Sequence, residues 1–352
     1  MTQRRAIRIG TASVLLRPRH LVVAVIALLA LGAVTVFSLG TGDFTLSPDR
    51  VLAGIAGSGT RQENVIIGSV RLPRVLSGIA VGAALALSGA IVQTLARNAL
   101  ASPDLLGVTA GASAGAVAVI TLSGSGIAVS GLLREVGVPL AAGAGSVVAA
   151  AAVALLLRRT GYGGVRPILI GLGVSIFFGG LTSWMLLAAE ITDAAKANLW
   201  LAGSLNGRSW PEFVVVFSAL VLSCLILVRL ASYLPALSLG IDTARGLGVP
   251  IRPVVGSLLA IALLLAAVSA SAAGPIGFVA LVAPHLARLL SGSTRAPLGL
   301  SAMLGALLLT GTDLVARMAL APIQLPVGSV VALVGAPFLV WLLISSRRKA
   351  YV

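Results

Sequence analysis

The chain has 352 residues, of which 58% are hydrophobic and only 10% are charged, and its mean hydropathy is +1.08. A soluble domain carries about 25% charged residues, so this composition excludes an ordinary soluble protein. The net charge is +15. A basic chain can indicate nucleic-acid binding, but here the cations flank long apolar runs. Membrane orientation explains them better, and no nucleic acid is expected as a partner.

Ten long apolar segments occupy most of the chain. Runs of about 20 apolar residues match a bilayer core of about 30 Å, and in lipid they form helices because backbone polar groups must be satisfied internally. The sequence therefore predicts an all-α integral membrane protein with ten transmembrane helices. The predicted spans are 21–40, 72–96, 105–122, 136–157, 165–189, 211–231, 253–273, 274–291, 297–318 and 326–345.

The distribution of Lys and Arg predicts the orientation. With a cytoplasmic N-terminus, the inner loops hold 17 of the 25 Lys and Arg residues and the outer loops hold the other 8. Cytoplasmic loops carry an excess of these residues, so both termini are predicted to be cytoplasmic. The chain then divides into a cytoplasmic segment (1–20), a single ten-helix domain (21–345) and a cytoplasmic tail (346–352).

The predicted spans are almost free of carboxylates. Ion-coupled secondary transporters usually bury carboxylates near mid-membrane, whereas here Asp313 lies near the outer end of its span. The sequence also lacks a G-x-x-x-x-G-K-[ST] phosphate loop, an HExxH motif and any cluster of His or Cys. We therefore expect no enzymatic activity, no cofactor and no bound metal. Uphill transport would need energy from another polypeptide.

Glycine is unusually frequent, with 41 residues. In membranes, small residues allow helix backbones to approach closely. Gly107, Gly111 and Gly115 repeat every four residues and are predicted to line one packing face of a helix. Tight static packing and sliding of these faces during a transport cycle are both compatible with this pattern.

Three stretches of sequence carry a resemblance to a known family. The first is Arg71-Leu-Pro-Arg74 running into 75–113, and the second is LSLGIDTARGLGV (237–249). The third comprises AAGPIGFVALVAPHLARLL (272–290), GTDLVAR (311–317) and QLPVGSVVALVGAPFLVWLL (324–343). In order and spacing, these blocks resemble the iron-siderophore and cobalamin permease family of ABC importers.

The resemblance implies a ten-helix subunit of a type II ABC importer in the bacterial cytoplasmic (inner) membrane. Its two inverted four-helix halves would be helices 2–5 and 7–10. The implied partners are a second permease subunit (a copy or a paralogue), two ATP-binding cassette subunits and an extracytoplasmic substrate-binding protein. The implied cargo is a metal chelate, with a ferric siderophore favoured by the prevalence of iron systems and with cobalamin and heme left open.

The resemblance assigns Arg71, Arg74 and Arg317 to docking of the binding protein, because arginines at these motif positions meet its glutamates. Guanidinium groups pair bidentately with carboxylates and remain charged at any relevant pH. The alternatives are interfacial snorkelling and an internal Arg317–Asp313 pair at i, i+4. Pro73 is predicted in the first helical turn, where its missing N–H costs nothing.

The inner segment 237–249 is assigned by the resemblance to coupling with the ATPase. The residues assigned to this role are Leu239, Gly240, Ala244, Gly246 and Gly248, in a short helix–turn–helix that could act as a rigid lever. The alternative is an ordinary basic loop.

Two further assignments follow from the resemblance, and a third follows from the residues themselves. Gly163, Gly164 and Val165 occupy the position of the cytoplasmic gate, although hydroxyl residues stand there in the cobalamin member. The stretch 198–210 resembles a short external helix. His285 and Arg288 are interpreted as a structural cluster at a helix end near the ATPase.

Overall fold

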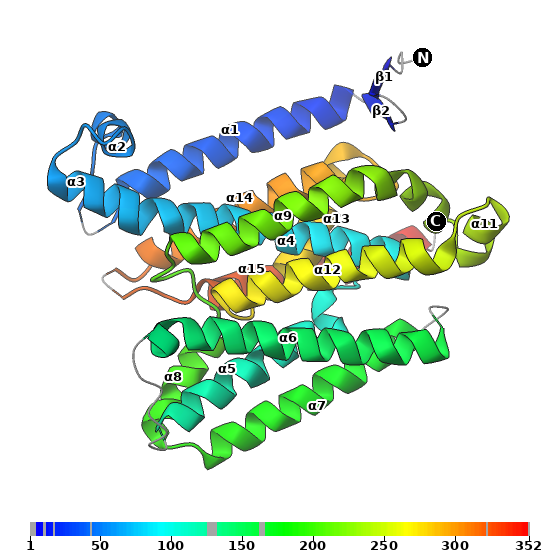
Figure 1. The fold of residues 1–352 in the computed structure, drawn as a ribbon. Helices are drawn as coiled ribbons and strands as arrows, with labels where there is room; N and C mark the ends of the chain where they lie inside the picture. Colours follow the sequence, from blue (N-terminus) through cyan, green and yellow to red (C-terminus); the bar gives the residue numbers. More distant parts are fainter. Residues whose placement is uncertain are drawn as a thin grey trace.

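A computed structural model describes the chain except for residues 1–4, 10–11, 17, 43, 125–131, 162–165, 322 and 351–352. Long helices run side by side and form an elongated bundle (Figure 1). Strand β1 (Arg5–Ile9) and α11 (Ile241–Gly246) lie at one end of the bundle, here called the inner end. Helices α2 (Pro48–Ile55) and α3 (Arg61–Val65) lie at the opposite, outer end.

Each predicted apolar segment overlaps one helix, and the helix in the predicted span 274–291 begins only at Val279. These helices are α1 (Pro18–Gly40), α4 (Leu72–Ala96), α5 (Val108–Gly124), α6 (Leu132–Thr160), α7 (Arg166–Ala188), α9 (Trp210–Leu230), α12 (Ile251–Ala273), α13 (Val279–Ser291), α14 (Leu298–Met318) and α15 (Val327–Ala350). Within the described residues, seven helices are long and apolar enough to cross a membrane, and α5, α13 and α15 supply shorter apolar helices. A helical membrane protein is therefore confirmed, and the count of ten spans stays a prediction.

The described chain is not purely helical. Strands β1 and β2 (Ala12–Leu16) form an antiparallel hairpin in which Arg5 pairs with Leu16 and Ile9 with Ala12. This hairpin lies in the segment 1–20, which was predicted without strands. Because strand pairing here is confined to ten residues beside the first helix, it leaves the helical architecture unchanged.

Short helices connect the long ones and were mostly not predicted. They are η1 (Ile66–Arg71), η2 (Pro103–Leu106), α8 (Ile191–Leu201), η3 (Ala231–Tyr233) and α10 (Leu234–Leu237), together with α2, α3 and α11. The external helix expected over 198–210 is wrong in its position, since α8 ends at Leu201 and is followed by a loop. The short lengths of these elements leave little hydrophobic periodicity from which to predict them.

Helices α4 and α12 are the most buried of the seven helices that are long and apolar enough to cross a membrane. Helix α4 packs against α9, α12, α13 and α14. Close approach depends on small residues: a Cβ at Gly82 would collide with the backbone at Gly305, and one at Gly89 with the backbone at Ala280. Dispersion contacts and close packing drive association of helices in lipid, where the hydrophobic effect between helices is absent. The backbone of α4 is therefore the centre of the bundle.

The predicted glycine face is divided between two neighbours. Gly111 and Gly115 lie against the backbone of α6 at Gly145 and Ala141, where no Cβ would fit. Gly107 instead precedes α5, adopts φ +81°, and packs against Val174 of α7. The prediction of one shared face is therefore wrong for Gly107, because η2 ends there in a left-handed turn.

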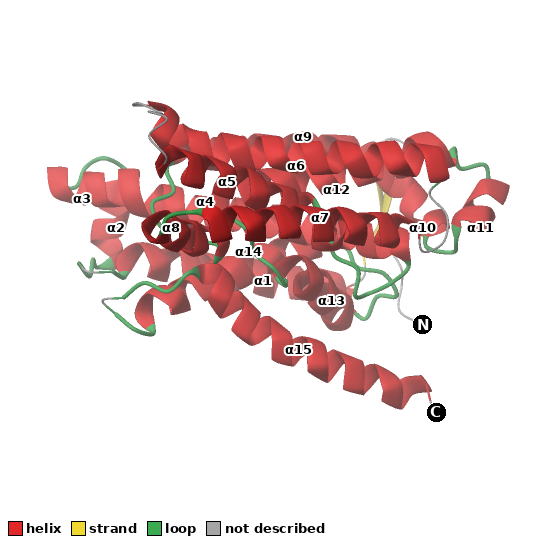
Figure 2. Ribbon diagram, turned by 90° about the horizontal axis from the view of Figure 1, so that it is seen from below, coloured by secondary structure: helices red, strands yellow, loops and turns green. Residues whose placement is uncertain are grey.

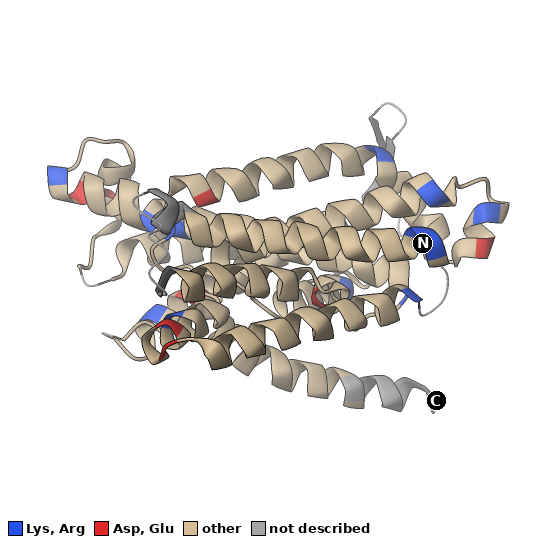
Figure 3. Ribbon diagram, turned by 60° about the horizontal axis from the view of Figure 1, so that its bottom comes forward, with Lys and Arg blue, Asp and Glu red and all other residues tan. Residues whose placement is uncertain are grey.

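The outer surface of the bundle is apolar along its length. Charged residues gather towards the two ends in Figure 3. Helix α15 diverges from the other helices towards its C-terminal end (Figure 2). Bulky side chains such as Leu29 on α1 and Leu225 on α9 are exposed, as expected for surfaces that face lipid.

Candidate functional site

Arg74 forms the centre of a buried polar cluster at the outer end. Its Nε donates to the two carboxylate oxygens of Asp313 at 3.1 and 3.3 Å, and its Nη2 donates to Oδ1 at 2.9 Å. Its Nη1 donates to the side-chain oxygens of Gln324 at 2.8 Å and Asn206 at 3.3 Å. The exposed fractions are only 7% for Arg74 and 3% for Asp313. The cluster therefore ties α4 and α14 to two outer loops.

Arg317 shares the same carboxylate. Its Nε lies 3.3 Å from Asp313 Oδ2, one turn earlier on α14. Its guanidinium also donates to the carbonyl and the hydroxyl group of Ser38 near the end of α1. The internal i, i+4 pair that the sequence allowed is thus present.

Arg71 is bound to the backbone where α1 ends. Its Nη1 donates to the carbonyl of Leu39 at 2.7 Å and its Nη2 to the carbonyl of Phe44 at 2.5 Å. These carbonyls belong to the helix end and the following loop, which lack intrahelical partners. Arg71 therefore anchors α1 to the start of α4.

The helix that carries these arginines does not begin where the sequence predicted. The helical backbone is continuous from Arg61 to Ala96, so Pro73 is not at a free helix start. Proline disrupts an ordinary helix interior because it lacks an N–H and its ring clashes with the preceding turn. Here the preceding turn is the π-helix η1, and the Leu72 N–H donates to the carbonyl of Ile67, five residues back. The wide turn accommodates the proline, and such turns are frequent at functional sites.

A cavity of about 680 Å³ opens beside these residues at the outer end. It is lined by Arg71, Arg74 and Arg317, together with Gln324 and parts of the loop after α1. Three arginines against Asp313 leave the cluster with excess positive charge. Docking of a binding protein by these arginines stays a prediction.

A compact turn completes the outer end. The Thr60 N–H donates to the Glu63 carboxylate at 2.8 Å, and the Glu63 N–H donates to Thr60 Oγ1 at 3.3 Å, which is a capping box for α3. Arg50 on α2 forms an ion pair with Glu63 at 3.1 Å. The hydrogen bonds from Thr60, followed by the charge of Arg50, hold the pKa of Glu63 below its ordinary value of 4.5.

The inner end carries the segment predicted to couple to the ATPase. Short helices α10 and α11 are joined by a turn in which Gly240 adopts φ +119°, and Gly248 follows α11 with φ +83°. Glycine tolerates these left-handed conformations. Ala244 is fully buried beneath the segment, whereas Gly246 ends α11 in open space. The expected helix–turn–helix is therefore present in the structure.

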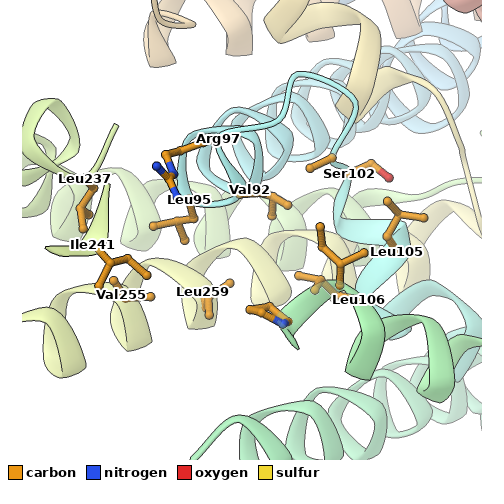
Figure 4. A pocket seen from close by; sticks show the side chains of 14 residues that line it. Val92, Leu95, Arg97, Ser102, Leu105, Leu106, Leu237, Ile241, Val255 and Leu259 are labelled. Atoms are coloured by element: carbon orange, nitrogen blue, oxygen red, sulfur yellow. The ribbon is translucent and has the colours of Figure 1, made fainter. Parts of the chain in front are cut away.

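The segment is seated on the membrane helices through apolar side chains. Figure 4 shows Leu237 and Ile241 facing Val255 and Leu259 of α12 across a small pocket. The pocket measures about 70 Å³. Leu237 and Val255 belong to the same buried apolar cluster, so α10 packs against α12 at this point.

An open groove lies beside the same segment. It measures about 750 Å³ and is lined by Leu239 and Leu247, each 64% exposed, and by the guanidinium groups of Arg97, Arg288 and Arg295. Leu239 and Leu247 are therefore exposed apolar side chains at the inner end of the bundle. The lining arginines favour an acidic partner surface.

Arg97 is a residue of this groove that sequence reasoning missed. It caps the end of α4 in a left-handed conformation (φ +50°), which is uncommon for a residue other than glycine. Its guanidinium lies so close to Gly240 that a Cβ there would be 3.1 Å from Nη1. No local sequence signal distinguishes this arginine from the other inner cations.

His285 and Arg288 form the pair expected near the inner end of α13. Arg288 Nη2 lies 2.7 Å from His285 Nδ1, and because a guanidinium only donates, the imidazole nitrogen accepts. His285 is buried and packs edge-on against Phe338 of α15. The residues predicted as a gate, Gly163, Gly164 and Val165, lie outside the described residues. Within the described residues, no group of three or more His, Cys, Asp or Glu could hold a metal ion.

The apolar helical bundle, with a cationic cluster at its outer end and an open groove at its inner end, defines a polytopic membrane protein. The model of the FecCD transport family matches residues 28–345, and the chain belongs to this family. This confirms the resemblance to siderophore and cobalamin permeases. Members of the family are transmembrane permease components of ABC importers, in which a separate subunit carries the ATPase.

Individual relatives agree with this assignment. The chain is 38% identical to the ferric enterobactin transport system permease protein FepG of Escherichia coli (strain K12), covering 89% of this chain and 93% of that one. It is 37% identical to the cobalamin import system permease protein BtuC of Halobacterium salinarum, covering 81% and 75%. The fold matches a metal-chelate type ABC transporter in an inward-facing conformation with a TM-score of 0.80 and 30% identity, covering 94% and 100%. The chain is thus a multi-pass protein of the bacterial inner membrane.

Proposed function

We propose that this chain is the permease subunit of an ATP-driven importer for ferric siderophores. The observation that carries the proposal is the inner groove, in which two exposed leucines stand beside three arginines. A transporter that worked alone would have no use for such a surface, whereas an ATPase subunit would cover it. The ferric-siderophore cargo is supported by relatives such as FepG, and cobalamin and heme are the alternative cargoes.

We propose ten spans, with both termini in the cytoplasm and with α4–α7 and α12–α15 as inverted four-helix halves. The coincidence of ten apolar segments with ten helices supports the count. Strand β1 and α15 both reach the inner end, which agrees with the excess of Lys and Arg there. The domain boundaries are those expected from the sequence: 1–20, 21–345 and 346–352.

The outer arginines are proposed to receive the substrate-binding protein. Arg71, Arg74 and Arg317 line one cavity, and their hydrogen bonds are made within the chain, but one aspartate leaves the cluster with excess positive charge. This charge supports attraction of an acidic surface of that protein to the cavity. A second permease subunit, either a copy or a paralogue, and two ATPase subunits would complete the importer.

The segment 237–249 is proposed to transmit ATP binding and hydrolysis to the spans. Leu239 supplies an exposed contact, Ala244 an anchor, and Gly240, Gly246 and Gly248 the turns. The contacts of Leu237 and Ile241 with α12 support this role. Gly163, Gly164 and Val165 remain the proposed gate between α6 and α7.

Reconstitution in vesicles tests the function. The chain, its partner permease, the ATPase and the binding protein are incorporated together, and uptake of a ferric siderophore is compared with uptake of cobalamin and heme. We expect ferric-siderophore uptake that requires ATP and all partners, is blocked by vanadate and is unaffected by ionophores. Uptake by the isolated chain that follows an ion gradient would instead establish a secondary transporter.

A further inference from the structure

A long groove runs between α6 and α12 in the inner half of the bundle. It has a volume of about 790 Å³, and the two helices run side by side there in Figure 1. Small residues open it, among them Ala150, Ala151 and Ala154 on α6 and Ala260 on α12. Leu263 and Leu157, both buried, contribute to its lining. From Val147 to Arg158 the α6 wall extends for about 16 Å at 1.5 Å per residue.

Two cations close the inner end of this groove. Arg158 lies in the last turn of α6 and Arg252 in the first turn of α12, and both are exposed. No carboxylate belongs to the described lining, and neither arginine forms an ion pair with another described residue. The positive dipole end of α12 and the negative dipole end of α6 meet here and offset each other, so the positive charge of the site comes from the two guanidinium groups.

The combination selects one kind of ligand. An apolar wall about 16 Å long matches acyl chains, whereas two unpaired guanidinium groups at the membrane surface match a phosphate group. We propose that the α6–α12 groove binds an anionic phospholipid of the inner leaflet. Its acyl chains lie along Ala151, Ala154 and Ala260, and its phosphate accepts hydrogen bonds from Arg158 and Arg252. Basic pockets between transmembrane helices on the cytoplasmic side suit such headgroups.

The headgroup site adjoins the coupling segment. A second cavity, of about 690 Å³, shares Arg252 and Pro253 with the groove and is also lined by Asp242 and Arg245 of α11. Asp242 is already paired with Arg245 at 3.3 Å, so it does not neutralise Arg252. A bound lipid would therefore lie next to α11 without competing with an internal ion pair.

Binding of phosphatidylglycerol to the purified full-length chain tests the proposal. Native mass spectrometry gives the dissociation constants for phosphatidylglycerol and phosphatidylcholine in wild type, Arg158→Gln, Arg252→Gln and Arg159→Gln. Arg159 is the matched control, because it is the next cation on α6 and does not line the groove. We expect Arg158→Gln and Arg252→Gln each to weaken the binding of phosphatidylglycerol about fivefold. Arg159→Gln should leave this binding unchanged.

Two further measurements distinguish binding of the acyl chains in the groove from binding of a free phosphate ion at the arginines. Ala154→Leu narrows the groove without changing its charge, so it should weaken the binding of both phospholipids. Inorganic phosphate should not displace phosphatidylglycerol at matched concentration. Equal affinity for the two phospholipids, an equal effect of Arg159→Gln, or full displacement by phosphate would overturn the proposal. The melting temperature of each variant in lipid-free detergent is first compared with that of wild type. If a glutamine variant is destabilised, Arg158→Lys or Arg252→Lys is measured in its place. These lysine variants should retain the preference for phosphatidylglycerol.

Discussion

Two arginines of the inner groove, Arg97 and Arg295, are used differently from the three arginines that line the outer cavity. At the outer end, the guanidinium groups of Arg71, Arg74 and Arg317 are occupied by one carboxylate, backbone carbonyls and loop side chains. At the inner end, Arg97 and Arg295 are exposed in a groove beside two exposed leucines. The outer cations therefore stabilise the fold of the subunit itself, whereas Arg97 and Arg295 lie on the surface that we propose the ATPase subunit covers.

The largest effect should follow from removing the shared carboxylate. Asp313→Asn leaves Arg74 and Arg317 buried without an anion, and breaking a buried pair in this way costs about 3–5 kcal/mol. The melting temperature of the purified chain measures this loss. Asp242→Asn is the control at the inner end, where the aspartate side chain is 96% exposed and its ion pair contributes at most about 1 kcal/mol. Similar losses in the two variants would mean that the outer cluster is not specially stabilising.

The inner leucines are the next target. Leu239→Asp and Leu247→Asp should each weaken binding of the ATPase subunit about 30-fold, because central apolar contacts of an interface contribute about 2 kcal/mol. Titration of the ATPase onto the chain in lipid nanodiscs measures the dissociation constant. The control is Leu52→Asp on α2, which changes an equally exposed leucine (67%) at the outer end. This variant should leave the dissociation constant of the ATPase unchanged. Unchanged affinity in all three variants would remove the groove from the ATPase interface.

The ends also differ in how far the sequence predicts them. The spans could be predicted because bilayer thickness imposes a length on each apolar run, and α4 ends at the predicted residue, Ala96. The Arg317–Asp313 pair could be anticipated because it is local on one helix. The Arg74–Asp313 contact joins residues 239 positions apart, and no periodicity specifies such a pairing.

Backbone features that depend on tertiary contacts also could not be predicted from the sequence. The π-helix η1 is a response to Pro73 within a continuous helix, and the sequence instead favoured a helix start at that proline. Arg97 adopts a conformation typical of glycine while its side chain packs on Gly240. At the inner end, by contrast, closely spaced glycines did predict the turns around α11, because glycine reports local backbone conformation.

The same conservative substitution at each end sharpens the comparison further. Arg71→Lys keeps the charge but has a single ammonium group in place of a fork that reaches two carbonyls, so we expect a loss of about 1–2 kcal/mol of stability. Arg295→Lys, at an exposed inner position, should change stability by less than about 0.5 kcal/mol. Chemical denaturation in detergent measures both. A loss for Arg295→Lys as large as that for Arg71→Lys would contradict the distinction.

The smallest effect concerns pH at the outer end. The pKa of Glu63 is lowered in the folded state, chiefly by the Thr60 N–H, so the unfolded state binds more protons in acid. The stabilisation is present above the ordinary value of 4.5 and is lost as the pH falls through the lowered pKa. Hydrogen exchange of the α2–α3 amides, normalised to intrinsic rates, should therefore accelerate in wild type as the pH falls below the ordinary pKa of 4.5. It should stay nearly flat in Glu63→Gln. Arg50→Gln removes the ion pair but keeps the capping box, so it should retain most of the pH dependence; a flat profile in that variant would assign the effect to Arg50 instead.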